Sequence, residues 1–226
     1  MEKFRIGLIR VLTSEDQEFV DMHGKVIMDH FPGLAVESRC IPDQWEGIHS
    51  YELFRIAVPK IVKLAREEFA GKDMIIVSCA DDPGVEEIRE ALPGMPVTGG
   101  GETTVAAALY YSEKVAVLGI TDEAPRAYRR ILGDRLVASS RPASVHSTLD
   151  LMTPEGERDC LDCARELKSK GAKVIALGCT GLTTIGIAKK IEEATGLPVV
   201  DPVIAEGLFA SLEAVRRSGG YGGGKS

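Results

Sequence analysis

The sequence predicts an α/β protein of two similar lobes, each with a parallel sheet of roughly four strands flanked by helices. Short apolar segments alternate with helical patterns along almost the whole chain, which is typical of parallel sheets with crossover helices. One sequence unit occurs twice, at 73–97 and at 173–199. It consists of an apolar strand, a cysteine, small and polar residues, a helix and a Gly-x-Pro-Val segment. Ile6–Thr13 and Val115–Thr121 form a second repeat, a strand that ends in threonine before a helix. Both repeats indicate pseudosymmetric lobes.

The first half of the chain is expected to alternate strands and helices from its first apolar segment. In order, the elements are strand 3–11, helix 14–31, strand 34–40, helix 51–69, strand 73–78, helix 83–92 and strand 95–98. Ser14 and Gln17 have the spacing of a capping box, which predicts Ser14 as the N-cap of the first helix. Pro59 is expected to bend or break the second helix. Asp82 before Pro83 has the pattern of an N-cap for the third.

The second half repeats this alternation after Gly99–Gly101, which is expected to be a hinge or a turn of close backbone approach. Its elements are helix 102–111, strand 114–120, helix 123–132 with Asp122 as N-cap, strand 135–139, helix 154–170, the second cysteine unit at 172–200 and helix 202–217. The predicted lobes are therefore 1–98 and 99–200. The segment 201–217 is expected to pack back on the first lobe. The glycine-rich tail 218–226 cannot build a core and is expected to be disordered.

Composition and charge exclude several classes of partner. Hydrophobic residues make up 44% and charged residues 27%, as in ordinary soluble globular proteins. No apolar run approaches the roughly 20 residues that span a bilayer, and the first residues lack a signal-peptide layout. A formal charge of −7 without a basic cluster predicts no nucleic-acid partner. Five cysteines without disulfide-framework spacing predict the reducing cytoplasm. The expected partner is a small molecule, with neither nucleic acid nor membrane.

Cys79 and Cys179 are the candidate reactive residues, since each ends a strand of the repeated unit. Ligands of parallel α/β sheets bind beyond the carboxyl ends of strands, which predicts one cleft between the lobes, lined by Thr13, Cys79, Thr121 and Cys179. A helix N-terminus just after a thiol favours the thiolate, which lowers the thiol pKa from about 8.5. Two such thiols could serve as base and acid on opposite faces of a substrate, as stereoinversion next to a carbonyl requires. The alternative is that both are small core residues.

Three motifs resemble those of the aspartate/glutamate/hydantoin racemase superfamily, and within it most closely the hydantoin racemases. They are the turn Cys79-Ala-Asp-Asp-Pro-Gly84, the segment Gly99-Gly-Gly-Glu102 and the second cysteine motif Gly178-Cys-Thr-Gly-Leu182. The resemblance covers the chain up to its glycine tail. It implies that Cys79 and Cys179 are the two catalytic acid/bases, that no metal or pyridoxal cofactor takes part, and that the chain forms a homo-oligomer.

The first strand departs from this pattern. Hydantoin racemases typically carry Asn-Pro-Asn-Thr after it, whereas this chain has Arg10-Val-Leu-Thr13. Arg10 could pair with a substrate carboxylate, or it could form a salt bridge at the lobe surface. Carrying the family's motifs onto this chain gives a predicted set of substrate-binding residues: Arg10, Thr13, Ala80, Asp81, Thr121, Thr180 and Gly181.

Other conspicuous residues are assigned less specific roles. Cys160 and Cys163 lie inside a predicted helix, away from its start and without further zinc ligands, so packing is the better account. Asp82 is read as a helix cap and Asp81 as a charge that raises the pKa of Cys79. His146 is more simply a surface residue than a lining of the cleft. Trp45 and His49 are expected at the cleft rim. Gly99–Gly101 lacks the strand and helix context of a phosphate loop.

The sequence therefore predicts a cofactor-independent racemase of 5-substituted hydantoins or related cyclic ureides such as allantoin, with proton transfer between two cysteines. The nearest alternative is an aspartate/glutamate-type amino-acid racemase, in which Arg10 binds a carboxylate of the substrate. More distant alternatives are a decarboxylase or cis–trans isomerase of the same fold, and a non-catalytic ligand-binding protein that closes as a clamp.

Overall fold

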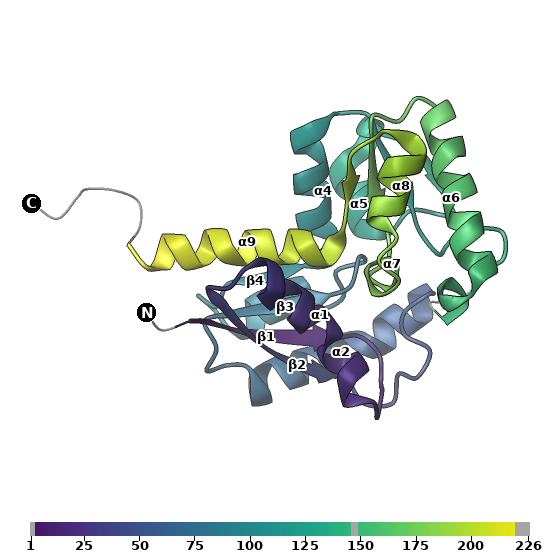
Figure 1. Cartoon of the computed structure of the whole chain (residues 1–226). Coiled ribbons are helices and arrows are strands. Elements are labelled where there is room, and N and C mark those ends of the chain that lie inside the picture. The colour runs from purple at the N-terminus through teal and green to yellow at the C-terminus, as the bar shows by residue number, and fades with distance from the viewer. Residues whose placement is uncertain (1–2, 146–148, 220–226) are drawn as a thin grey trace, which may run out of the picture.

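The computed structural model describes residues 3–145 and 149–219, which form two sheets of four parallel strands each (Figure 1). The strand orders are β2-β1-β3-β4 and β6-β5-β7-β8. Elements of the first half are β1 Phe4–Arg10, α1 Gln17–His30, β2 Leu34–Cys40, α2 Tyr51–Glu68, β3 Met74–Ser78, α3 Val85–Ala91, β4 Val97–Gly99 and α4 Gly100–Tyr111. Those of the second half are β5 Val115–Leu118, α5 Arg126–Leu132, β6 Leu136–Ser140, α6 Pro154–Ser169, β7 Val174–Leu177, α7 Gly181–Thr184, α8 Ala188–Thr195, β8 Val199–Val200 and α9 Pro202–Arg217, with short 3₁₀ turns at Gly133–Arg135 and Leu149–Met152. The predicted α/β class with two parallel sheets is confirmed.

Both sheets are buried on their two faces, as parallel sheets require. In β1, Ile6 and Leu8 pack toward α1 and α9, and the alternate residue Ile9 packs toward α2 and α3. The second sheet has one core against α6 and α8 and another against α4 and α5. Cys160 and Cys163 belong to the α6 core, at 0% and 9% exposure, which confirms their packing role.

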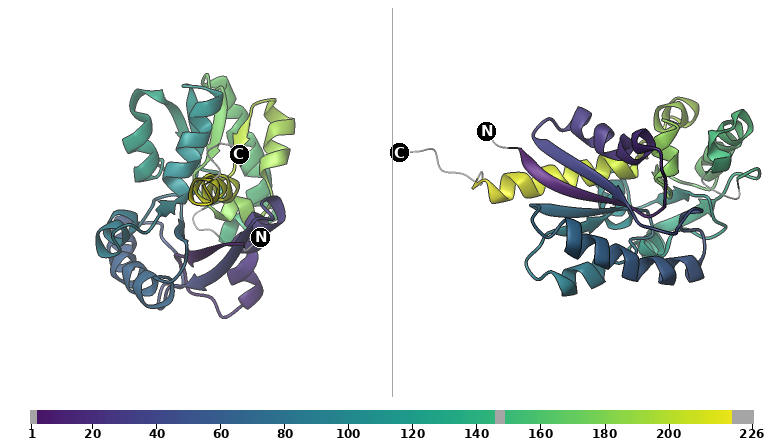
Figure 2. Two further views of the ribbon diagram at one scale, coloured as in Figure 1. Left: turned by 90° about the vertical axis from the view of Figure 1, so that its left-hand side faces the viewer. Right: turned by 90° about the horizontal axis from the view of Figure 1, so that it is seen from below.

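The last helix lies between the lobes. In the left view of Figure 2, α9 (yellow) is seen end-on, with the second-lobe helices on one side and the first sheet on the other. Val203 and Ala210 of α9 belong to the same core cluster as Ile6 and Leu8 of β1. On its other side α9 packs against α4. The helix therefore forms part of the core beneath the first sheet and also touches the second lobe.

Two helix starts differ from the expected ones. The N-cap of α1 is Asp16, whose carboxylate accepts from the backbone N–H groups of Glu18 and Phe19 at 2.9 and 3.4 Å. Ser14 instead accepts from the backbone N–H of Asp16. Asp and Ser are comparable N-cap residues, so local pattern alone does not separate them. Likewise Asp122 does not cap α5: its carboxylate pairs with Arg141 at 2.9 Å, and α5 begins at Arg126.

Helix α2 runs through Pro59 without interruption, so the predicted break is absent. Pro59 is exposed, and on this side of a helix water can bind the carbonyl that proline leaves without its partner.

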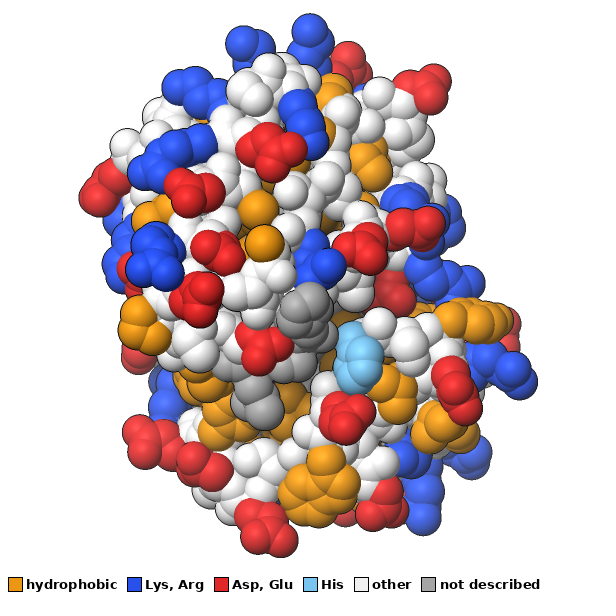
Figure 3. Space-filling model, turned by 90° about the vertical axis from the view of Figure 1, so that its right-hand side faces the viewer, with side chains coloured by type: hydrophobic (Ala, Val, Ile, Leu, Met, Phe, Trp, Pro, Cys, Tyr) orange, Lys and Arg blue, Asp and Glu red, His pale blue; other side chains and the backbone are white. Residues whose placement is uncertain are grey.

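Among the described residues, no helix has the length and apolarity needed to cross a bilayer. The face shown in Figure 3 carries acidic and basic side chains interspersed, without an extended basic surface among the residues described there. The predictions for His146 and for tail residues 220–226 fall outside the described residues.

Candidate active site

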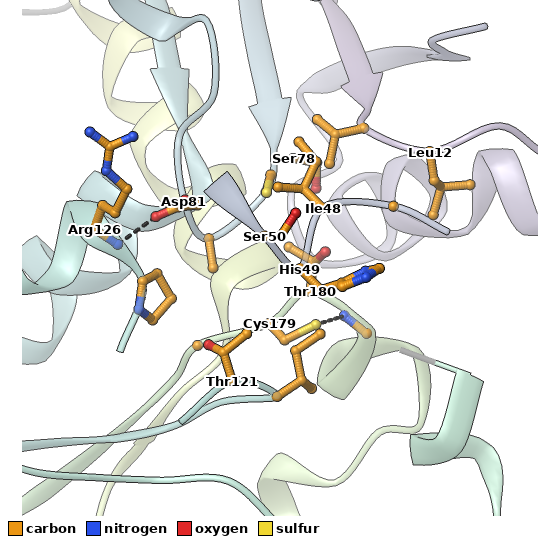
Figure 4. A pocket seen from close by; sticks show the side chains of 18 of the residues that line it. Leu12, Ile48, His49, Ser50, Ser78, Asp81, Thr121, Arg126, Cys179 and Thr180 are labelled. Carbon is orange, nitrogen blue, oxygen red and sulfur yellow. Dashed lines mark hydrogen bonds between the residues drawn. The ribbon is translucent and has the colours of Figure 1, made fainter. Parts of the chain in front are cut away.

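A cavity of about 290 Å³ lies where the carboxyl ends of β1, β3, β5 and β7 meet (Figure 4). Four strand-end segments line it, at 10–12, 78–81, 120–121 and 178–181. The 47–51 segment and the residues around the start of α5 complete the wall. Because β1 and β3 belong to one sheet and β5 and β7 to the other, the two lobes contribute equivalent strand ends to one pocket.

Of the nine site residues predicted from sequence, eight line this cavity: Arg10, Cys79, Ala80, Asp81, Thr121, Cys179, Thr180 and Gly181. Thr13 does not. Its hydroxyl donates to the Ile41 carbonyl at 2.7 Å and accepts from the Gln44 N–H at 2.8 Å. Thr13 therefore anchors the loop that follows β2, and its assignment to substrate binding is not supported by its position.

Cys179 lies in the tight turn between β7 and α7. Its Sγ accepts a hydrogen bond from the backbone N–H of Gly181 at 3.3 Å (Figure 4). The preceding residue has to be glycine, because a Cβ on Gly178 would lie 2.7 Å from Cγ1 of Val117. An N–H aimed at sulfur favours the thiolate over the thiol, so this turn suits a base.

Cys79 has a different environment. Burial raises the pKa of the Cys79 thiol well above its usual value, and the charges of Asp81, Cys179 and Asp82 raise it further. The Asp81 backbone N–H opposes them. The predicted lowering of this pKa by a helix N-terminus is wrong, because the turn 80–84 separates Cys79 from the start of α3 at Val85. The upward effect of the Asp81 charge is confirmed.

Asp82 fixes the Cys79 turn to the start of α4. It has φ +52°, and its carboxylate accepts from the backbone N–H groups of Gly101 and Glu102 at 2.6 and 2.8 Å. Asp82 is thus a helix cap, but for α4 rather than α3, whose N-cap is Gly84. Burial raises the Asp82 pKa to about 7, although both N–H bonds lower it.

The glycine run makes this contact possible. A Cβ on Gly99 would lie 2.1 Å from Oδ1 of Asp82, and one on Gly101 would lie 2.4 Å from the Ala80 carbonyl oxygen. The expected close backbone approach at Gly99–Gly101 is confirmed, and the residues approached are those that follow Cys79.

Arg10 is buried at 3% exposure, so the surface salt bridge considered for it is wrong. One guanidinium nitrogen, Nη1, donates to the carbonyls of Phe19 and Val20 at 2.7 and 3.2 Å, and the group lies 4.8 Å from the Phe19 ring centre. Burial lowers the Arg10 pKa to about 10, and the charges of Cys40, Glu206 and Cys179 oppose that shift. Arg10 therefore stays charged at neutral pH and supplies positive potential at the pocket wall.

Sequence reasoning missed the contact that closes one side of the pocket. The Arg126 guanidinium lies 4.9 Å from the ring centres of both Tyr51 and Phe54, which joins α5 to the start of α2 across the lobes. The Arg126 backbone N–H donates to Asp81 (Figure 4). His49 also lines the pocket, whereas Trp45 is 63% exposed and does not. No local pattern links an arginine to aromatic residues about seventy positions earlier.

Replacing Arg126 with alanine is expected to loosen the start of α2. Each cation–π contact at an exposed site is worth about 0.5–1 kcal/mol, so amide hydrogen exchange at 51–55 should accelerate roughly tenfold. Hydrogen-exchange mass spectrometry measures this. Arg130→Ala, on the same helix, is the control, since no ring contact of Arg130 occurs in the described structure. Unchanged exchange in the Arg126 variant would contradict the role of the contact.

Two matched lobes, each contributing a cysteine to one shared pocket, define a two-lobed α/β protein with its site at the lobe interface. The family model described as Asp/Glu/Hydantoin racemase matches residues 6–206. The chain belongs to the Asp/Glu/hydantoin racemase family.

Individual proteins are similar to this chain over part or most of its length. A hydantoin racemase of Paenarthrobacter aurescens is 28% identical over 152 residues, which is 61% of this chain and 62% of that protein. An uncharacterised protein of Schizosaccharomyces pombe is 33% identical over 226 residues, covering 91% of this chain and 92% of its own. The solved structure of allantoin racemase from Klebsiella pneumoniae superposes with a TM-score of 0.77 at 23% identity, over 96% of this chain and 89% of that one. The similarity to the allantoin racemase structure shows a shared fold.

Proposed function

We propose that this protein is a cofactor-independent racemase that inverts the stereocentre of 5-substituted hydantoins or related cyclic ureides such as allantoin. The observation that carries the proposal is the placement of Cys79 and Cys179 at the ends of the equivalent strands β3 and β7, on one cavity between the lobes. The relative named hydantoin racemase and the fold shared with an allantoin racemase support the substrate class.

The two thiols would begin a turnover in different protonation states. Cys179, with an N–H on its sulfur and the positive Arg10 on the same pocket wall, is the resting thiolate. Cys79, whose pKa is raised by burial and by neighbouring carboxylates, is the resting thiol. This assignment gives each cysteine the form that its surroundings favour.

The proton transfers then balance without a further reactant. The Cys179 thiolate takes the proton from C5 of the ring, and the electron pair moves into the adjacent carbonyl to form an enolate. The Cys79 thiol delivers its proton to the opposite face of C5 and becomes the thiolate. Backbone N–H groups of the two turns, at Ala80 and Thr180, would stabilise the enolate oxygen. The opposite enantiomer uses the same steps in reverse.

The test is a panel of single enantiomers followed by optical rotation: 5-substituted hydantoins, allantoin, aspartate and glutamate. Loss of rotation with a hydantoin or allantoin is the expected result. Absence of racemisation with every compound would contradict the proposed function. The predicted homo-oligomer and cytoplasmic location remain proposals alongside it.

A carboxylate-bearing substrate is the second candidate, and Arg10 is the observation that favours it. Arg10 lines the pocket and is charged, and no carboxylate lies within ion-pair distance of it among the described residues. If Arg10 binds a substrate carboxylate, losing its paired donors should raise KM substantially for acidic substrates.

For a ureide substrate we expect Arg10→Lys to leave KM within about threefold, since a neutral ring needs no bidentate partner and lysine keeps the positive charge. Steady-state kinetics on a ureide and on glutamate measures the difference. A rise of about tenfold or more in KM, confined to the acidic substrate, would instead identify an acidic amino acid as the natural class.

A further inference from the structure

A buried network of polar side chains lies beside the cavity, and the proposed mechanism does not use it. His23 of α1, Ser78 of β3 and Glu206 of α9 are 0%, 1% and 0% exposed. His23 Nδ1 lies 2.8 Å from Ser78 Oγ, and Ser78 Oγ donates to Glu206 Oε2 at 2.9 Å. This network thus joins three elements that are far apart in the sequence.

One end of this network reaches the Cys179 turn, and the other reaches α4, the helix whose start contacts the Cys79 turn. Ser78 immediately precedes Cys79 and itself lines the cavity. The His23 ring lies near enough to the Thr180 backbone for that backbone to raise the His23 pKa, against the larger lowering caused by burial. Thr180 immediately follows Cys179. A Cβ on Gly100 at the start of α4 would lie 2.8 Å from Glu206 Oε1.

Stability alone is a poor explanation for these residues. Glu206 Oε1 is buried without a hydrogen-bond partner in the described structure. Unpartnered polar atoms destabilise a core, and apolar side chains of similar volume commonly replace such groups without loss. The α1/α9 face of the first sheet is otherwise packed with aliphatic residues that would accept them. A network of this kind instead fixes its members in one arrangement.

We propose that His23, Ser78 and Glu206 are positioning residues that hold the Cys79 and Cys179 turns at the separation needed for proton transfer on both faces of one substrate. The inference rests on the proposed two-cysteine racemase function and adds to it. None of the three touches the reacting carbon: Ser78 acts through the backbone of Cys79, and His23 acts through the turn that contains Cys179.

Hydrogen exchange and inversion make different demands on the placement of the two cysteines. Exchange of the C5 hydrogen with solvent requires only one thiolate at the correct distance. Inversion requires the second thiol to be in place on the opposite face before the enolate is reprotonated from the first. Loosening one turn against the other should therefore reduce inversion more than exchange. A general loss of stability would reduce both in proportion to the folded fraction.

The experiment measures both rates in heavy water on a single enantiomer of the substrate identified by the panel, using chiral chromatography with mass detection. In Ser78→Ala, the ratio of exchange with retention to inversion should rise on the order of tenfold, because displacements of about 1 Å have large effects on proton transfer. Glu206→Gln keeps an oxygen that accepts from Ser78, so this variant should leave the ratio close to that of the wild type. Ser38→Ala is the matched control, a buried serine in the same sheet on β2, which β1 separates from β3.

An unchanged ratio in Ser78→Ala, with both rates lowered equally, would overturn the proposal. If that variant does not fold, His23→Leu carries the same test with the same two outcomes. A wild-type protein that shows neither exchange nor inversion would instead contradict the proposed function, so the two failures are distinguishable.

Discussion

Cys179→Ser and Cys79→Ser should each abolish inversion in both directions. In the proposed mechanism every turnover uses one cysteine as base and the other as acid, and the roles exchange with the enantiomer. A serine hydroxyl in either position is too weak an acid to form the needed anion, and loss of one general acid or base typically costs about 10²–10⁴-fold in rate. We expect kcat to fall by at least about 10³-fold in each variant.

Cys40→Ser is the control for this comparison. Cys40 ends β2, beside the end of β1, but does not line the cavity. The control should retain racemase activity, and circular dichroism should show that all three variants are folded. Full turnover by either of the two single variants at the site would rule out the two-cysteine mechanism.

Gly101→Ala should destabilise the protein and displace the Cys79 turn. The added Cβ would lie 2.4 Å from the Ala80 carbonyl oxygen and 2.7 Å from the Ala127 Cβ. Neither is the end of a flexible side chain, so the backbone has to move. Overpacking of this kind costs about 1–3 kcal/mol, and the Asp82 carboxylate would lose its place against the N-terminus of α4.

Urea unfolding monitored by circular dichroism measures the free energy of unfolding. Gly71→Ala is the matched control: it lacks a positive φ, and a Cβ there would meet nothing within 4 Å. We expect the control to change stability by less than about 0.5 kcal/mol. An equally stable Gly101 variant with unaltered activity would show that the close approach at Gly101 is not required.

The parts of the fold that sequence reasoning found are those governed by local pattern. The apolar runs that end at Cys79 and Cys179 predicted β3 and β7 because a buried parallel strand reads as a continuous apolar segment. The same rule placed both thiols at carboxyl strand ends, which meet at one edge of a sheet. Thr153 and Asp201 could also be recognised from sequence, since each precedes a proline at the first position of its helix.

The remaining features depend on contacts between distant segments. Asp82 has the local pattern of a cap for α3, yet its carboxylate binds the N-terminus of α4 about twenty residues later, and its φ of +52° is not the extended conformation of an N-cap residue. Arg10 continues a strand pattern, and only the packing of α1 over β1 shows it to be buried. Thr13 matches the family motif, but its hydroxyl hydrogen-bonds to the loop after β2. None of these partners has a spacing that a single sequence reveals.

The origin of the hydrogen on the inverted carbon tests the central claim most directly. One enantiomer of the hydantoin or allantoin substrate, incubated in heavy water, is sampled at low conversion and the product enantiomer is examined by mass spectrometry. Two cysteines acting on opposite faces predict a product with one solvent deuterium at C5, since the proton removed by one thiolate is not the one returned by the other thiol. A product that retains the hydrogen of the substrate would contradict the account.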